Sequence, residues 1–282
     1  MLDTYGKNAA GPQTFNPESW LQSELHRQAR RKRRYLTEVW IWRLASIGGL
    51  LALWEIAAAQ RWINPFFTSR PSAVGVFLFE SAMSGTFWDH VSITIQQTLW
   101  GVLAAAIAGV LCAFILAQSK MLQDVVDPIL SFLNSLPRVA FAPLFVAYFG
   151  LGMMSKIVLA FSLCFFIILE GALTGMKRID PDLVMLTRQL GAGRVQHYTK
   201  LVLPNALPSI FAALRLALID GFLAVVVGEM IGSNKGIGQQ IAFYSGVLRI
   251  DAVFGLLLVL GLIASFLAAV LRMVENRLLR WQ

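Results

Sequence analysis

Charged residues are scarce in this sequence. They make up 14 % of its 282 residues, whereas an ordinary soluble domain has about 25 %. Hydrophobic residues reach 57 %, and the mean hydropathy is +0.64. With so few polar side chains, the chain is not expected to fold as a water-soluble domain. The composition predicts an all-α protein that crosses a membrane several times.

Cysteine and histidine are rarer still. The only two cysteines, Cys112 and Cys164, lie inside apolar runs, so we expect neither a disulfide framework nor a metal site. The histidines His26, His90 and His197 lie in segments too far apart to share a metal ion. No G-x-x-x-x-G-K-[ST] motif and no pairing of a nucleophile with a base is present. We therefore expect no catalysis, no metal, no other cofactor and no ATP site in this chain.

The sequence does contain a series of apolar runs. The length of each run is close to the roughly 20 residues that a helix needs to cross a bilayer. Six spans are predicted, at about Val39–Ala59, Thr94–Ala117, Val126–Gly150, Ile157–Met176, Ile210–Ile231 and Phe254–Val274. Another apolar run, Ala73–Met83, is too short to span and is expected to form an interfacial helix on the outer face.

The distribution of basic residues predicts the orientation. Residues 1–37 contain the run Arg30–Arg34, which directly precedes a span and is typical of a topological anchor at the lipid surface rather than a nucleic-acid site. With the N-terminus inside, sixteen of the 24 Lys and Arg residues lie on the inner side. Five lie on the outer side, namely Arg61, Arg70, Lys156, Lys235 and Arg249. We therefore predict a cytoplasmic basic tail, residues 1–37, a membrane domain, residues 38–282, and two cytoplasmic termini.

The segment between the fourth and fifth runs is too polar for hydrocarbon. Asp180 followed by Pro181 predicts a helix start, and Gly191 predicts its end. A second short helix is expected from Val195 to about Leu203, ending at Pro204. From the residues alone, this segment, 180–208, is either a rigid helical element for a partner or an amphipathic loop on the membrane surface.

The same residues resemble the permease signature of ATP-binding-cassette importers, EAA–x3–G–x9–I–x–L–P. Gly191 falls on its glycine, Leu201 on its isoleucine, and Leu203 and Pro204 on its final pair. The Glu-Ala-Ala portion is replaced by Met185, Leu186 and Thr187, so the resemblance implies no charge contact there. In that family this element is the coupling helix, which docks on the ATPase subunit.

Two further blocks, residues 137–152 and 228–241, extend the resemblance to permeases of the nitrate, sulfonate, taurine and bicarbonate class, from about residue 64 onward. The glycines of the second block predict a flexible turn at the outer surface. The resemblance implies the type I importer permease fold, with a core transmembrane region at about residues 88–276. It further implies a homodimer in the bacterial inner membrane, ATPase subunits that bind the ATP, and a periplasmic or lipid-anchored binding protein. The implied activity is ATP-driven import of a small anionic solute, such as a sulfonate, taurine, nitrate, bicarbonate or a carboxylate.

The third run is irregular, because Pro137 and Pro143 interrupt it and should kink or break its helix. A broken helix at membrane depth faces protein or a watery cavity, so this span should line the interior. Arg138 follows the first proline, and an arginine at this depth costs about 3 kcal/mol. Two hypotheses account for it: it pairs with Asp220 of the fifth run, or it lines the pathway and contacts a passing anion.

An ion-coupled secondary transporter or a channel is the alternative function. Such a protein carries its own coupling-ion site, built from acidic residues at the membrane midplane, and often has inverted repeats. Midplane charge is sparse in this sequence, and no clear repeat is present. The importer permease is therefore the preferred interpretation.

Overall fold

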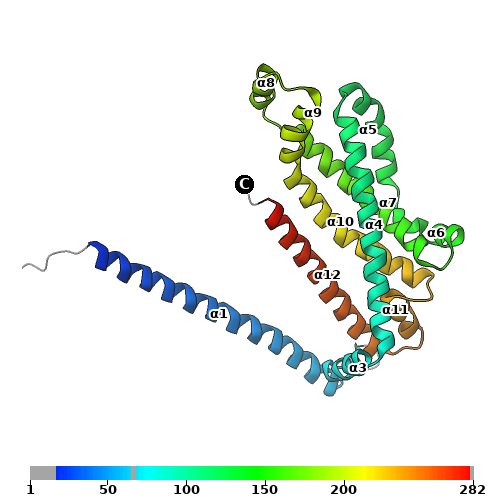
Figure 1. Ribbon diagram of the computed structural model, residues 1–282. Helices are drawn as coiled ribbons and strands as arrows, with labels where there is room; N and C mark the ends of the chain where they lie inside the picture. Colours follow the sequence, from blue (N-terminus) through cyan, green and yellow to red (C-terminus); the bar gives the residue numbers. More distant parts are fainter. Residues whose placement is uncertain (1–16, 65–67, 280–282) are drawn as a thin grey trace, which may run out of the picture. The chain divides into compact units, whose positions relative to one another are not determined.

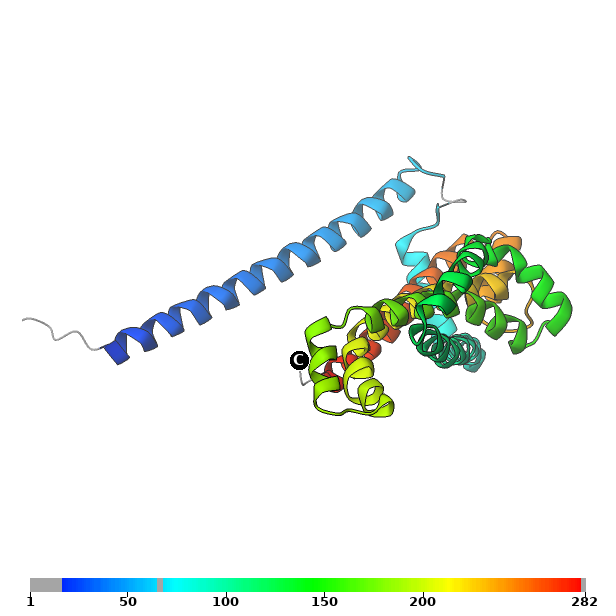
Figure 2. The same ribbon diagram turned by 90° about the horizontal axis from the view of Figure 1, so that it is seen from above.

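The computed structural model describes residues 17–64 and 68–279, and within these ranges every regular element is a helix. The chain forms two units, Met1–Ile63 and Asn64–Gln282. The first unit contains helix α1, which runs without a break from Pro17 to Ala59 (Figure 2). Its second half, Thr37–Ala59, is long and apolar enough to cross a membrane. The first 16 residues of the predicted basic tail lie outside the described residues.

Four uninterrupted helices of the second unit match predicted spans. They are α4 (Gly85–Ala117), α7 (Met153–Lys177), α10 (Leu203–Ile231) and α12 (Ile250–Leu278). Each extends beyond its predicted run, because hydropathy detects only the part of a helix that lies in hydrocarbon. The remaining predicted span is a bent pair of helices. The described residues therefore contain five helices that could each cross a membrane, or six spans if the bent pair counts as one.

The broken span consists of α5 (Lys120–Ser135), a short 3-10 turn and α6 (Ala142–Phe149), with a bend of 71°. The bend follows from Pro137, which has no N–H to donate and disfavours helical geometry in the residue before it. Pro143 instead lies in the first turn of α6, where a proline is tolerated. Of the two prolines expected to interrupt the run, only Pro137 marks the break.

Helices α4, α7 and α10 lie side by side in the second unit (Figure 1). Small residues let them approach closely: a Cβ at Gly101 of α4 would lie 2.6 Å from the Cβ of Ala160 in α7. A Cβ at Gly171 of α7 would lie 2.3 Å from the Cβ of Ala213 in α10. In a membrane, where lipid tails are as apolar as leucine, such close packing is a main source of helix association.

The two ends of this bundle carry different short helices (Figure 1). At one end lie α3 (Pro71–Met83) and α11 (Ile237–Gly246), both packed against α12. The short apolar run predicted to be helical is therefore present as α3, and its place at the membrane surface stays a prediction. At the other end lie α8 (Pro181–Gln189) and α9 (Arg194–His197), which belong to the segment that resembles the coupling element.

Candidate functional site

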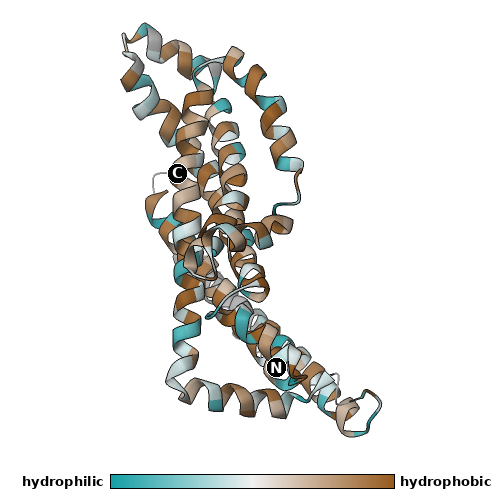
Figure 3. Cartoon of the chain, turned by 90° about the vertical axis from the view of Figure 1, so that its right-hand side faces the viewer, coloured by the Kyte–Doolittle hydropathy of each residue, from teal (hydrophilic) through white to brown (hydrophobic). Residues whose placement is uncertain are grey.

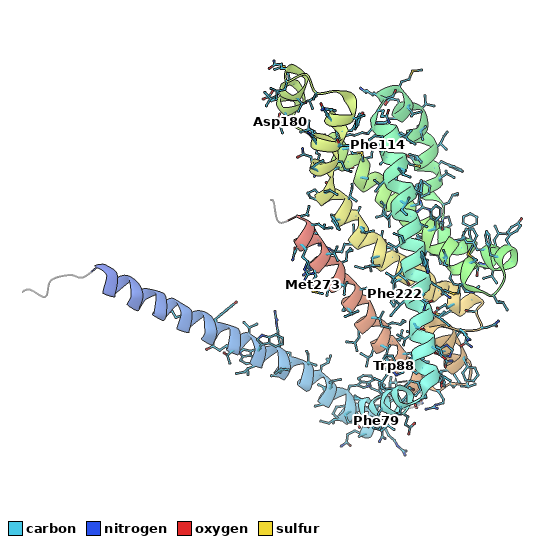
Figure 4. The ribbon with its side chains drawn as sticks, in the orientation of Figure 1. Phe79, Trp88, Phe114, Asp180, Phe222 and Met273 are labelled. Atoms are coloured by element: carbon cyan, nitrogen blue, oxygen red, sulfur yellow. The ribbon has the colours of Figure 1, made fainter. Side chains whose placement is uncertain are left out.

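Residues 180–208, which resemble the coupling element and are called the coupling segment below, begin with a helix that is built as the sequence predicts. Asp180, at the start of α8 in Figure 4, accepts a hydrogen bond on Oδ1 from the Asp182 backbone N–H at 2.9 Å. Such a cap satisfies one of the free N–H groups of the first turn. At the other end, Gly191 has φ of +73°, a left-handed conformation that favours glycine.

This segment exposes several apolar side chains although much of its sequence is polar. The exposed apolar side chains are Leu183, Met185, Leu186, Leu190 and Val195. Thr187 is half-buried and donates its hydroxyl to the carbonyl of Val184. Exposed apolar residues gathered on a short polar segment are typical of a docking surface for another protein. The positions that replace Glu-Ala-Ala thus offer apolar rather than charged contacts.

The second helix differs from the prediction. It does not end at Pro204: α9 continues through a π-helical turn, Tyr198–Val202, into α10, so that Val195–Ile231 forms one continuous helix. The Leu203 N–H bonds the Tyr198 carbonyl, five residues back, and this wider turn precedes the proline. Asn205 adds a side-chain bond of 2.9 Å to the carbonyl of Leu201. The expected stop was wrong because a π turn and side-chain bonds can accommodate proline inside a membrane helix.

The π turn contacts the rest of the bundle. Tyr198 meets Phe114 of α4 edge to face, with ring centroids 5.0 Å apart, and Figure 4 shows Phe114 at the coupling end of α4. A cavity of about 340 Å³ lies beside this contact, lined by Phe114, Gln118, Met176, Val195, Tyr198, Thr199, Val202 and Leu203. Val202 is buried, whereas Leu203 remains 41 % exposed. The signature residues thus join the surface segment to the membrane bundle.

Arg138 is held by α5 and α7 rather than by α10. Its guanidinium donates to Oδ1 of Asn134 and to the Leu163 carbonyl, and lies 4.0 Å from the ring centroid of Phe166. The side chain is 9 % exposed. Asp220 is exposed on α10, and the described residues contain no ion pair between it and Arg138. The hypothesis that Arg138 forms an ion pair with Asp220 is therefore wrong. Hydrogen bonds and a cation–π contact stabilise the charge of Arg138 instead.

Glu170 is a residue that the sequence analysis missed. Its Oε1 accepts a hydrogen bond of 3.0 Å from Nδ2 of Asn134, whose own oxygen accepts from Arg138. The three side chains therefore form a chain of hydrogen bonds that links the bend of the third span to α7. A carboxylate inside the predicted span 157–176 was the available signal, because an ionisable residue at membrane depth marks a functional position by default.

Replacing Arg138 with glutamine should destabilise the bend. Asn134 and the Leu163 carbonyl would lose a charged donor, at a cost of about 2 kcal/mol. We expect the unfolding temperature of the purified protein to fall by roughly 6 °C. Adding Asp220→Asn should restore none of the loss, because Asp220 is not the partner. Rescue by Asp220→Asn would contradict this assignment, and unchanged stability with slower uptake would favour the pathway hypothesis.

A second buried polar cluster lies at the opposite end of the bundle. Lys156, counted among the outer-side residues from the sequence, is 0 % exposed, and Glu229 is 1 % exposed. The Lys156 ammonium donates to the carbonyls of Leu151 at 2.9 Å, Gly152 at 3.2 Å and Gly232. Buried charges are stable only when hydrogen-bonded in this way. The hydrogen bonds of Lys156 therefore hold residues 228–241, the glycine-rich block, against the start of α7.

The Glu229 carboxylate completes this cluster. It accepts 2.8 Å hydrogen bonds from the Thr94 hydroxyl of α4 and from the Gly238 backbone N–H. Gly236 has φ of +116° and donates its N–H to Nδ1 of His90 at 2.9 Å. The predicted turn is present between α10 and α11, and Gly236 and Gly238 allow it to pack closely around the Glu229 carboxylate, which the sequence did not indicate.

Comparisons with known proteins agree with these features. The chain is 29 % identical over 243 residues to the taurine transport system permease protein of Escherichia coli, covering 84 % of this chain and 88 % of that protein. It is 28 % identical over 233 residues to the riboflavin transport system permease protein of Chloroflexus aurantiacus, covering 83 % of this chain and 87 % of that protein. It is 28 % identical over 243 residues to the nitrate import permease protein of Leptolyngbya laminosa, covering 84 % of this chain and 82 % of that protein.

The fold is similar to the crystal structure of a bacterial ABC transporter involved in the import of the acidic polysaccharide alginate. The TM-score is 0.61, with 17 % identity over 91 % of this chain and 98 % of that chain, so this likeness concerns the fold alone. Residues 101–280 match the sequence family described as binding-protein-dependent transport system inner membrane component. The chain belongs to this family of importer permeases.

Proposed function

We propose that this chain is the permease subunit of an ATP-driven importer and forms the translocation pathway for a small anionic solute. The observation that carries this proposal is the coupling segment, with its capped helix α8, its left-handed Gly191 and its exposed apolar side chains. The relatives named for taurine and nitrate import support an anionic solute, such as a sulfonate, nitrate, bicarbonate or carboxylate. Another relative is named for riboflavin transport, so similarity to these permeases does not by itself identify the solute.

The proposed mechanism uses the continuity of the coupling segment with a span. Two copies of this chain would each present α8 and α9 to one ATPase subunit, with both chain termini on the cytoplasmic side of the inner membrane. ATP binding closes the ATPase pair and moves the coupling segments together. Because α9 runs through the π turn into α10, movement of α9 reaches the membrane without a flexible joint. The spans then alternate between inward-open and outward-open states.

The proposed pathway follows the broken third span and α10. Pro137 produces the bend, Pro143 lies in the first turn of the helix beyond it, and Asp220 is exposed on α10. Arg138 holds the bend from a largely buried position. A periplasmic or lipid-anchored binding protein would deliver the solute to the end that carries α3 and α11.

Energy supply gives the direct test of this function. The purified chain alone should show no ATP hydrolysis above background, because its sequence has no phosphate-binding loop. Uptake into proteoliposomes should require an ATPase subunit, the binding protein and ATP. The same assay without ATP, under a proton or sodium gradient, serves as the control. Uptake by this chain alone under such a gradient would establish the secondary transporter instead.

A further inference from the structure

The N-terminus of α11 is capped by side chains of other helices. The N-cap residue of α11 is Gly236, which has no side chain to accept a hydrogen bond from the first N–H groups of the helix. The three consecutive backbone N–H groups of residues 236–238 instead donate to acceptors on α4 and α10. These acceptors are Nδ1 of His90 at 2.9 Å, Oγ1 of Thr94 at 3.0 Å and Oε2 of Glu229 at 2.8 Å. The turn that begins α11 is therefore held by the bundle and not by its own sequence.

Only the neutral form of His90 fits this cap. Its Nδ1 accepts the Gly236 N–H, so the ring proton is on Nε2. The side-chain amide of Gln240 lies 3.1 Å from Nε2, and its oxygen can accept from that N–H. A second proton on the ring would sit on Nδ1 and face the Gly236 N–H, so that two donors would meet. A cation is also unfavourable at the N-terminus of a helix, where the peptide dipoles already place positive charge.

A polar cavity beside the ring offers the protonated form another environment. His90 lies two residues beyond Trp88, which Figure 4 shows at this end of α4. Most residues along the bundle helices are hydrophobic (Figure 3), but this cavity of about 60 Å³ has a polar lining. The polar residues of the lining are Ser81, Ser84, Thr86, His90, Gln240 and Tyr244. A cavity of this size can hold a few water molecules, which would hydrate an imidazolium that has left the turn.

The charged residues on the surrounding elements carry both signs in similar number. They are Glu80 of α3, Asp89 of α4, Lys156 of α7, Glu229 of α10, Lys235 of the turn, and Arg249 and Asp251 at the start of α12. Helix α11 has no charged residue, and Tyr244 is the other titratable residue in the lining of the cavity. Since opposite charges largely offset one another here, the hydrogen bond to Gly236 and the helix N-terminus decide which form of His90 fits the cap.

We propose that His90 is a pH-sensitive switch that holds the start of α11 when the ring is neutral and releases it when the ring is protonated. This inference rests on the proposed importer function, whose orientation puts α11 at the outer end, where the solute would be delivered. Imidazoles take up a proton between about pH 8 and pH 5. As the outer pH falls through this range, the protonated form increases and the turn is released. Uptake therefore slows in an acidic medium.

Hydrogen exchange of the complete importer in lipid nanodiscs tests the switch directly. The reporter is the peptide that contains residues 236–238, and its rates are corrected for the intrinsic effect of pH on amide exchange. Exchange of these N–H groups in the parent protein should be about tenfold faster at pH 5.5 than at pH 7.5, as expected for the loss of a hydrogen bond. Equal corrected rates at the two pH values would overturn the proposal.

Two substitutions of His90 separate the acceptor from the titration. In His90→Asn, the side-chain oxygen takes a position close to that of Nδ1, accepts from Gly236 and does not titrate, so exchange should be slow at both pH values. In His90→Gln, the polar end takes the position of Nε2 and leaves the Gly236 N–H without its acceptor, so exchange should be fast at both. His197→Asn, in the coupling segment, should leave the pH dependence of this peptide unchanged. A pH dependence in His90→Asn as large as in the parent would overturn the proposal.

Uptake measurements connect the switch to transport. Proteoliposomes of the complete importer take up solute with ATP inside, at outer pH 7.5 and 5.5 and a fixed inner pH. Uptake by the parent should fall about fivefold at the lower outer pH, relative to the change in His90→Asn, which corrects for any effect of pH on the binding protein. The same pH dependence in both proteins would overturn the proposal.

The exchange rates are measured without transport. A failure of the proposed function would appear separately, as uptake that does not require ATP. The two failures are therefore distinguishable.

Discussion

A Gly191→Val variant is expected to lose more than about 90 % of ATP-driven uptake, while a Gly193→Val variant keeps most of it. Neither glycine has another atom within 4 Å of its would-be Cβ, so space is equal at the two positions. They differ in backbone conformation, because Gly191 has φ of +73° and Gly193 has no such positive φ. A left-handed conformation costs an ordinary residue about 1–2 kcal/mol, and a β-branched residue more.

The substitution changes the position of α9 relative to α8. To avoid the strained turn, the Gly191→Val chain would shift the start of α9, and with it the surface presented to the ATPase. We expect the complex to assemble poorly or to hydrolyse ATP without transport. The measurement is uptake and stimulated ATPase activity of both variants in proteoliposomes, at matched protein levels. Normal uptake with normal ATPase stimulation in Gly191→Val would show that this segment is not the coupling element.

A Gly238→Ala variant is expected to be strongly destabilised, because Gly238 packs tightly in the buried polar cluster around Glu229. Its Cβ would lie 2.3 Å from the backbone carbonyl of Val226 and 2.8 Å from the Cβ of Glu229. A backbone atom cannot move aside as a flexible side chain can, so the Gly238–Glu229 hydrogen bond would be distorted as well. We expect a cost of about 3 kcal/mol.

The matched control lies in the same helix. Gly246 ends α11 and has nothing within 4 Å of its would-be Cβ. Gly238→Ala should lower the unfolding temperature by roughly 10 °C, and Gly246→Ala should change it by less than about 2 °C. Thermal unfolding of the detergent-solubilised protein measures both. Similar unfolding temperatures for the two variants would mean that the glycine-rich block is not closely packed around Glu229.

The sequence by itself determined the features that depend on local chemistry. The apolar runs predicted the spans because hydrocarbon accepts only long apolar helices whose backbone groups bond internally. The break at Pro137 followed from a missing N–H, and the end of α8 followed from the conformational freedom of Gly191. The signature residues around Gly191, with their place between two apolar runs and the blocks at 137–152 and 228–241, indicated the family, since their order and spacing are properties of the sequence.

Only the tertiary structure decided which charges are paired. Lys156 was assigned to the outer side from its place in the sequence, yet it is buried against the carbonyl of Gly232, 76 residues away. Glu229 bonds Thr94 across 135 residues, and Arg138 has Asn134 as its partner rather than Asp220. The continuation of α9 into α10 also escaped prediction, because proline signals a stop unless a π turn accommodates it. A buried charge must find hydrogen bonds, but sequence alone does not show which helix faces will supply them, since that depends on how distant segments pack.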